Sequence, residues 1–509
     1  MIPPILWAVG TRFLAIAAVF VLFRRYQKLG HIPGPFLAAF TDLWRARIQF
    51  FDSFIPTLIN VHEQYGPIVR IGPNTVSISD PSFIPIIASP RGGFAKADSY
   101  SPLRVFINGK SIGSLLDMQD EPLNRAIKRA VGPAFSAKNL LPFQPDLTRV
   151  LDALISNIRR YHLGGGPFNL YTTIQYFQLD FLFLTAFSTP PTHLPCNTDP
   201  HEMASTLYRR IFHWYAWQPL PRLERLIFQN RFLSKHIPST PSLWAAHSAR
   251  QITTRLSKSD PSPSSSSETS RPDLLQTYIS LTKSSSTPQP LTSAHQIPPS
   301  LLPTLTNSTI SAGADTTSGA LTAILYLILR HAHIHRTLLS ELTTAKLHHP
   351  ISYTQVQPLP YLDAVVREAL RLSAPLAIPL ERVVPKGGCR LGDTYLPPGT
   401  VVGVAPKVVH NDSEVFGDDT DTFRPERFLR RTREEIATME RANLAWGLGG
   451  RVCLGRNMAE MEIKVVVPTL LLSFDFKLCS PELDLAWDWG TFEMQRHPIM
   501  VTVSERNGT

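Results

Sequence analysis

Apolar residues recur at helical spacing through the first half of the chain, and Pro and Gly interrupt them at intervals. Residues 42–256 are therefore predicted to form helices, except for short β-prone pieces at residues 68–72 and 75–78. Ser, Pro and Thr then dominate residues 257–303, a composition that cannot bury a core and predicts surface loops. One apolar stretch, residues 274–281, is expected to form a short helix between these loops.

The second half contains a long apolar segment, residues 301–330, which carries few charges and has Ser, Thr and Gly crowded in its middle. Such a segment predicts a helix that runs through the interior. Further helices are expected at residues 360–373 and 453–472, with a β-prone section that ends near residue 409. The chain is thus predicted to be mainly α with a small β region.

The amino terminus carries a separate apolar run, residues 5–23, which as a helix would rise roughly 28 Å, about the thickness of the hydrocarbon core of a bilayer. Arg12 interrupts this run close enough to its amino end to reach the head groups. The alternatives are a cleaved signal peptide and a helix lying on the protein itself. A signal peptide should end in small residues, whereas this run ends in Arg24, Arg25 and Lys28. The pattern predicts a single transmembrane helix, and the positive-inside rule leaves the rest of the chain on the cytosolic side.

Two prolines around a glycine, within residues 31–35, are expected to end this helix and to form a stiff turn. We therefore predict a membrane anchor over residues 1–30 and one folded domain over residues 31–509. The Ser- and Pro-rich loops at residues 257–303 would lie within that domain.

Composition narrows the choice of partners. The 509 residues are 43% hydrophobic and 18% charged, which describes a foldable globular chain. Four cysteines show no CxxC pairing, which disfavours a zinc site or a disulfide framework and favours a reducing compartment. The formal net charge of +10 indicates an acidic partner or an anionic surface. Nucleic acid is the weakest candidate, since we find no zinc-finger spacing, basic helix with heptads or RNA-binding aromatic motif.

Candidate chemistry is concentrated in residues 446–455, which read Trp-Gly-Leu-Gly-Gly-Arg-Val-Cys-Leu-Gly. The glycines let the backbone approach a large flat ligand and leave amide groups free to point at a sulfur. Arg451 could pair with a carboxylate of that ligand. Cys453 stands where the last helix is expected to begin, and a helix amino end favours a thiolate over a thiol. A thiolate there can be the axial ligand of a haem iron, and the alternative is a buried apolar cysteine in a Gly-rich turn.

This segment resembles the haem-binding loop of the cytochrome P-450 superfamily. Gly449, Arg451, Cys453 and Gly455 stand in the matching places, and Trp446 replaces the usual Phe. The resemblance covers nearly the whole chain and implies the cytochrome P-450 fold, preceded here by the transmembrane helix. It also implies a haem b whose iron is held by the Cys453 thiolate.

Residues 312–317, Ala-Gly-Ala-Asp-Thr-Thr, are similar to the oxygen-activating segment of that family. The small residues Ala312 and Gly313 leave room for dioxygen beside the haem, and a Thr hydroxyl that bonds back to a preceding carbonyl can open a local groove. The resemblance implies that Thr316 steadies the bound oxygen and that Asp315 relays protons toward it. The residues alone leave open an ordinary Ser/Thr-rich helix in which Asp315 pairs elsewhere.

Three charged residues are implied to form a buried structural triad. Glu368 and Arg371 lie three residues apart on one helical face, where opposite charges can touch. Arg427 lies in a segment, Phe-Arg-Pro-Glu-Arg-Phe, that resembles the family's contribution of a second arginine. If buried, the three charges must stay together, and their implied role is to hold the cysteine loop in place.

Two more cofactor contacts follow from the resemblance. Arg382 matches an arginine that holds a haem propionate, and Lys128 keeps a cationic position on an upstream helix. Asn124 departs from the aromatic residue or His that is usual on that helix. Residues 91–116 are implied to cap the substrate pocket.

Within the superfamily the chain is similar to fungal microsomal members such as pisatin demethylase and benzoate para-hydroxylase. The resemblance implies a monooxygenase in the membrane of the endoplasmic reticulum that inserts one oxygen atom from O2 into a small apolar substrate, in secondary metabolism or in the oxidation of xenobiotic or aromatic compounds. No flavin or nicotinamide domain is expected after Cys453, so a separate NADPH-cytochrome reductase would supply electrons. The alternatives are a haem-thiolate isomerase or dehydratase that does not use O2, which Asp315 and Thr316 disfavour, and a non-catalytic haem carrier or sensor.

Overall fold

The computed structural model describes residues 20–21, 23–24, 26–51, 54–107, 110–199, 202–230, 242–257, 271–283, 297–429, 431–482, 487–488, 494–495 and 498–506. Most of the predicted membrane anchor, residues 1–30, falls outside these residues, so it stays a prediction. Most of the Ser- and Pro-rich sequence also falls outside them, although α13 forms where the short helix is predicted, at Leu274–Lys283.

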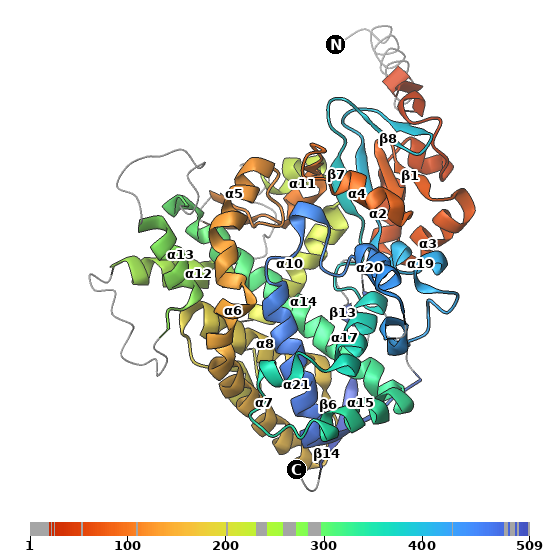
Figure 1. The fold of residues 1–509 in the computed structure, drawn as a ribbon. Helices are drawn as coiled ribbons and strands as arrows, with labels where there is room; N and C mark the ends of the chain where they lie inside the picture. Colours follow the sequence, from red (N-terminus) through yellow and green to blue (C-terminus); the bar gives the residue numbers. More distant parts are fainter. Residues whose placement is uncertain are drawn as a thin grey trace, which may run out of the picture.

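Helix α14, Leu302–Arg330, runs through the middle of the molecule, as its apolar sequence predicts (Figure 1). It packs against α8 (Leu170–Phe187), α12 (Leu243–Ser257), α17 (Pro360–Leu372) and α21 (Arg456–Ser473). Within the described ranges it is the one helix long and apolar enough to cross a membrane, but 72% of its most apolar window is buried inside the protein. It is therefore the central helix of the core.

The remaining helices surround this centre. They are α2 (Leu43–Phe50), α3 (Phe54–Tyr65), α4 (Ile84–Ile87), α5 (Glu121–Val131), α6 (Ala137–Leu140), α7 (Gln144–Gly164), α9 (His193–Cys196), α10 (Met203–Trp217), α11 (Pro221–Phe228), α15 (Ala332–Thr344), α16 (Tyr353–Val356), α18 (Pro406–Val409), α19 (Ser413–Phe416) and α20 (Arg433–Ala442). The fold is mainly helical, as predicted.

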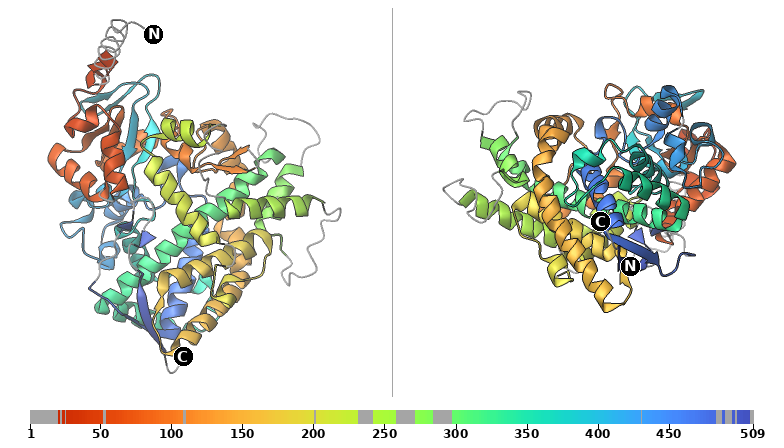
Figure 2. Two further views of the ribbon diagram at one scale, coloured as in Figure 1. Left: turned by 180° about the vertical axis from the view of Figure 1, so that it is seen from behind. Right: turned by 60° about the horizontal axis from the view of Figure 1, so that its bottom comes forward.

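A five-stranded sheet has the order β1-β2-β10-β7-β3. Its strands are β1 (Ile68–Gly72), β2 (Thr75–Ile78), β3 (Ala95–Lys96), β7 (Leu380–Val383) and β10 (Val401–Val404). The sheet and helices α2 to α4 lie on one side of the body, and α7, α8 and α12 lie on the other (Figure 2). Strands β1 and β2 occupy the residues whose β-branched pattern predicts them.

The other strands form small units. A three-stranded sheet joins β11 (Phe474–Leu478), β14 (Met500–Glu505) and β6 (Phe168–Asn169). Two-stranded sheets pair β4 (Val105–Ile107) with β5 (Lys110–Ile112), β8 (Cys389–Leu391) with β9 (Thr394–Leu396), and β12 (Trp487–Asp488) with β13 (Met494–Gln495).

Candidate functional site

A cavity of about 300 Å³ is bordered on one side by the cysteine loop, residues 446–455, and on another by helix α14. Trp446, Cys453 and Gly455 line it from the loop. Ala312, Gly313 and Thr316 line it from α14. The structure thus brings to one cavity two segments that the sequence separates by more than a hundred residues.

The cysteine loop is closed by its own backbone. A short 3-10 turn covers Gly449–Arg451, and the Cys453 amide donates to the carbonyl oxygen of Trp446 at 2.8 Å. Gly449 has a φ of 54°, and a Cβ at this position would collide with the Ala88 carbonyl, so the loop requires glycine there. A Cβ at Gly455 would meet no atom within 4 Å.

The predicted start of the last helix at Cys453 is wrong, because α21 begins at Arg456. The amide of Cys453 is committed to closing the loop, which places the cysteine just before the helix. Burial raises the pKa of the Cys453 thiol, whereas the backbone amides of Gly455 and Arg456 and the charge of Lys128 lower it. The helix begins three residues later than the sequence predicts, but its amino end still stabilises the thiolate form of Cys453.

On the α14 part of the cavity wall, the Thr316 hydroxyl donates to the Ala312 carbonyl at 2.6 Å. Six other hydroxyls of α14 make the same backward bond, so the bond alone does not distinguish Thr316: Thr306, Ser308, Thr309, Ser311, Ser318 and Thr322. Gly313 has a packing role as well, since a Cβ there would lie 3.0 Å from Leu182 on α8. Helix α14 remains continuous through this segment.

Asp315 faces α8 and is not among the residues that border the cavity. Its Oδ1 accepts a hydrogen bond from Gln175 Nε2 at 2.9 Å, and its side chain is 3% exposed. Burial raises the pKa of Asp315 to about 6, although the bond from Gln175 acts in the other direction. The partner of Asp315 is not identified by the sequence argument, although a glutamine within the apolar run of α8 was a signal that could have indicated it.

Five cations line the cavity, and four of them influence one another's charge: Lys96, Lys128, Arg382 and Arg451. Lys96 and Arg382 are paired in register between β3 and β7. Burial, with the nearby charges of Arg382 and Arg451, lowers the pKa of Lys96 well below its usual value. Lys96 is not predicted from the sequence, because only strand pairing places it beside Arg382.

The four cations have few anionic partners. Arg451 pairs with Glu121 at 2.7 Å and donates to the Met118 carbonyl at 2.8 Å. Lys128 Nζ donates to the Val452 carbonyl at 2.6 Å, inside the cysteine loop. Arg382 Nη1 is buried and has no hydrogen-bond partner within the described part of the chain. A buried cationic donor without a partner is costly unless an anion binds it.

These residues fit a haem. A cysteine sulfur is accessible from the cavity, small residues of α14 lie across it, and the cations can receive two propionate carboxylates. The unpartnered Nη1 of Arg382 is the observation that most directly indicates an anionic group.

The structure also brings the triad together. Arg371 binds both carboxylate oxygens of Glu368 at 2.8 Å, and Arg427 Nε binds one of them at 3.2 Å. All three side chains are completely buried. Arg427 also pairs with the partly exposed Asp419 at 2.8 Å, so two carboxylates balance the two arginines.

His410 links this triad to the cysteine loop, a connection that sequence reasoning misses. Arg371 Nη1 donates to the His410 carbonyl at 2.8 Å. The His410 ring lies between the Arg371 carbonyl, 2.9 Å from Nδ1, and the Leu444 amide, 2.8 Å from Nε2. Since the Leu444 amide must donate, Nε2 accepts and the ring is neutral. Burial, with the charges of Arg371 and Lys407, lowers the pKa of His410 to about 3, and this low pKa keeps the ring neutral.

Comparison with known proteins gives one family. The model of the cytochrome P450 family matches residues 38–503. A cytochrome P450 monooxygenase of Emericella nidulans, pkfB, is 32% identical, and the match covers 92% of this chain and 90% of the relative. One from Penicillium shearii, esdpH, is 34% identical, with 91% of both chains covered. A third, mpaDE of Penicillium brevicompactum, is 32% identical over 98% of this chain, which spans only 59% of that relative's length.

Proposed function

Because this chain belongs to the cytochrome P450 family, whose members hold a haem through a cysteine, we propose that it is a haem-thiolate monooxygenase that inserts one oxygen atom from O2 into a small, largely apolar molecule. The observation that carries this proposal is the shared cavity, which both Cys453 and the small residues of α14 line. Cys453 would hold the iron, and Arg382, Lys96, Lys128 and Arg451 would hold the propionates. When bound, the haem supplies the activation of O2 and the transfer of oxygen.

The protein's own residues supply exclusion of water and delivery of protons. Leucines from several elements make much of the cavity wall apolar: Leu115, Leu182, Leu207 and Leu305. The Thr316 hydroxyl lies on the cavity wall and donates to the Ala312 carbonyl, so its oxygen can still accept a hydrogen bond from a group in the cavity. Asp315 has a pKa near the working pH, which suits a group that takes up and releases protons. To serve the cavity, its carboxyl must rotate away from Gln175.

The site of action and the electron donor are part of the same proposal. Residues 1–30 would anchor the domain of residues 31–509 to the membrane of the endoplasmic reticulum, with the domain facing the cytosol. An NADPH-cytochrome reductase would supply electrons, and the net charge of +10 suits an acidic flavoprotein. Relatives named as fungal P450 monooxygenases support a role in secondary metabolism.

Reconstitution with labelled oxygen tests this function. The haem-loaded protein, a reductase and NADPH are incubated with a panel of apolar metabolites under 18O2, and the products are examined by mass spectrometry. We expect NADPH-dependent products that carry one labelled oxygen atom. Product that forms without NADPH would instead indicate an isomerase or dehydratase, and haem binding without turnover would indicate a carrier.

Asp315→Asn should raise the stability of the folded protein above about pH 6 and lower its activity. In the folded protein the carboxyl has a pKa of about 6 against an ordinary 3.8, so folding favours the protonated form. The folded state therefore loses stability as the pH rises from about 4 to about 6, by about 3 kcal/mol in all. Asparagine avoids this cost, so the variant should be more stable than the wild type at pH values above about 6 and equally stable below about 4. Oxygen insertion should fall by about 100-fold because a proton-transfer group is lost.

Thermal unfolding across this pH range measures the stability difference, and labelled-product formation measures the activity. Asp393→Asn is the control, because this aspartate is exposed on the turn between β8 and β9. The control should change neither property. A stability difference between Asp315→Asn and wild type that is independent of pH would contradict the raised pKa.

A further inference from the structure

An arginine on α10 lies on the wall of the same cavity as Cys453. Arg210 borders the cavity, and its Nε donates to the Leu103 carbonyl at 3.3 Å. Burial lowers the pKa of the Arg210 guanidinium to about 10, while the charges of Glu224 and Asp117 raise it. Its charge is therefore retained at neutral pH, in surroundings that solvate it poorly.

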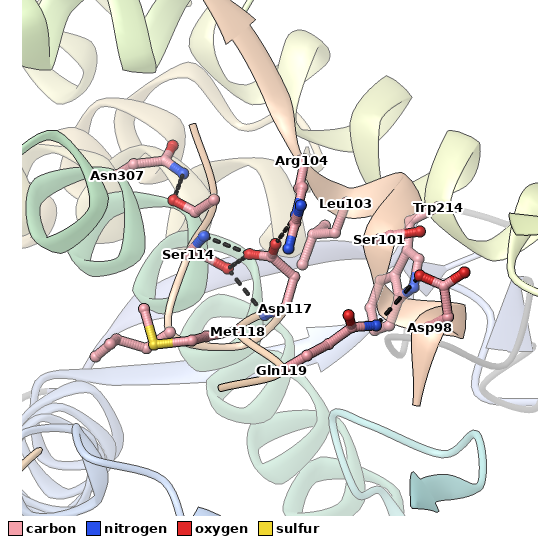
Figure 3. Close-up of polar contacts among 12 residues, drawn as sticks. Asp98, Ser101, Leu103, Arg104, Ser114, Asp117, Met118, Gln119, Trp214 and Asn307 are labelled. Atoms are coloured by element: carbon pink, nitrogen blue, oxygen red, sulfur yellow. Dashed lines mark hydrogen bonds and ion pairs between the residues drawn. The ribbon is translucent and has the colours of Figure 1, made fainter. Parts of the chain in front are cut away.

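The two carboxylates whose charges raise the pKa of Arg210 are hydrogen-bonded to other groups. Asp117 pairs with Arg104 at 2.7 Å and also accepts from the Ser114 amide and hydroxyl (Figure 3). Glu224 accepts from His213 Nε2 at 3.0 Å and from Gln229 at 2.9 Å.

No carboxylate among the described residues lies within ion-pair distance of Arg210. The guanidinium thus presents unused donors to the cavity.

Much of the cavity wall is apolar, and its apolar residues include Leu103, Val105, Leu116, Leu207, Ile211 and Trp244. A cation in poorly solvating surroundings pays a desolvation cost that an anionic ligand would offset with charge-assisted hydrogen bonds. The arrangement favours a molecule with an apolar body and one negative group.

Hydrogen bonds hold the segments near Arg210 in place. Trp214, one helical turn further along α10, donates from its indole to the Ser99 carbonyl at 3.0 Å. Gln119 donates to Asp98 at 3.2 Å and Asn307 to the Gly113 carbonyl at 3.4 Å, so residues 98–119 are tied at several points (Figure 3). A donor held in place before the ligand arrives binds with less loss of entropy.

We propose that Arg210 binds the carboxylate of the substrate, and that the substrates are apolar carboxylic acids. This inference rests on the proposed function, because it places the acid in the cavity that Cys453 and α14 border. The carboxylate would be held at Arg210 on α10 while the apolar body extends along the cavity toward the α14 segment that contains Thr316.

Matched acids and esters test the inference. The haem-loaded full chain is titrated with straight-chain and aryl-substituted fatty acids and with the methyl ester of each, and binding is followed by the change in haem absorption. We expect each acid to bind about tenfold or more tightly than its ester. Arg210→Gln should remove this preference while leaving ester affinity within about twofold, and Arg210→Lys should retain part of it.

Arg209→Gln is the matched control. Arg209 is the preceding residue on α10, but its side chain is 52% exposed and contacts Glu202 at 3.5 Å. This variant should keep the full preference for acids.

Three results would overturn the inference: equal binding of acids and esters by the wild type, a preference that survives Arg210→Gln, or no binding of any acid. The proposed function is judged separately, by incorporation of labelled oxygen into whichever compounds bind. If esters and acids are oxidised equally well, the role of Arg210 is contradicted and the monooxygenase function stands. If acids are preferred through Arg210 but no oxygen is incorporated, the monooxygenase function is contradicted and the anion site stands.

Discussion

Cys453→Ala should abolish the thiolate-specific absorption of the reduced, carbon monoxide-treated protein and lower oxygen insertion by about three orders of magnitude or more, a rise in barrier of about 4 kcal/mol or more. The reason is that alanine cannot donate the electron density that a thiolate ligand supplies. The fold should survive, because the Cys453 side chain is exposed toward the cavity and its amide, which closes the loop on Trp446, is unchanged.

Cys479→Ala is the matched control for this prediction. Cys479 is also exposed, but it is not among the residues that border the cavity. Absorption spectroscopy and labelled-product formation should distinguish the two variants completely. A normal thiolate spectrum in Cys453→Ala would show that another residue holds the iron.

Glu368→Ala should destabilise the protein by about 3–5 kcal/mol and reduce its haem content. The substitution leaves Arg371 and Arg427 fully buried without the carboxylate that binds both of them. Because Arg371 holds His410, and His410 holds the Leu444 amide, the start of the cysteine loop should lose its support as well. Denaturant unfolding and haem absorbance measure the two effects.

Arg367→Ala on the same helix is the control. Arg367 is 37% exposed and pairs with Asp363 and Glu440 on the surface. Its loss should cost no more than about 1 kcal/mol. Equal stability of Glu368→Ala and Arg367→Ala would contradict a structural role for the triad.

The sequence predicts those parts of the molecule that depend on local pattern. β-branched residues identify β1 and β2, and a long apolar segment with few charges identifies α14 as the central helix. The start of α21 is wrongly predicted, because a loop-closing bond of the Cys453 amide competes with helix formation and is not visible in a hydrophobic pattern.

The residues that the sequence does not reveal are those whose role depends on tertiary neighbours. Lys96 becomes part of the cationic group only through strand pairing, and His410 becomes a connector only because two loops approach it. Gln175 meets Asp315 only where α8 crosses α14. Such contacts join residues that are far apart in the sequence. Motif spacing and secondary-structure propensity describe local sequence, so they do not predict these contacts.

The pairing of Lys96 with Arg382 has a consequence for assembly. The two residues are 286 positions apart in the chain, and both reach the cavity because β3 and β7 meet in one register. A slip of one residue would turn either side chain to the opposite face of the sheet. Contacts of such long range form late, since the chain between them must first be ordered. The cationic cluster that would receive the cofactor therefore requires the correct register between β3 and β7, so cofactor binding depends on the pairing of this sheet edge.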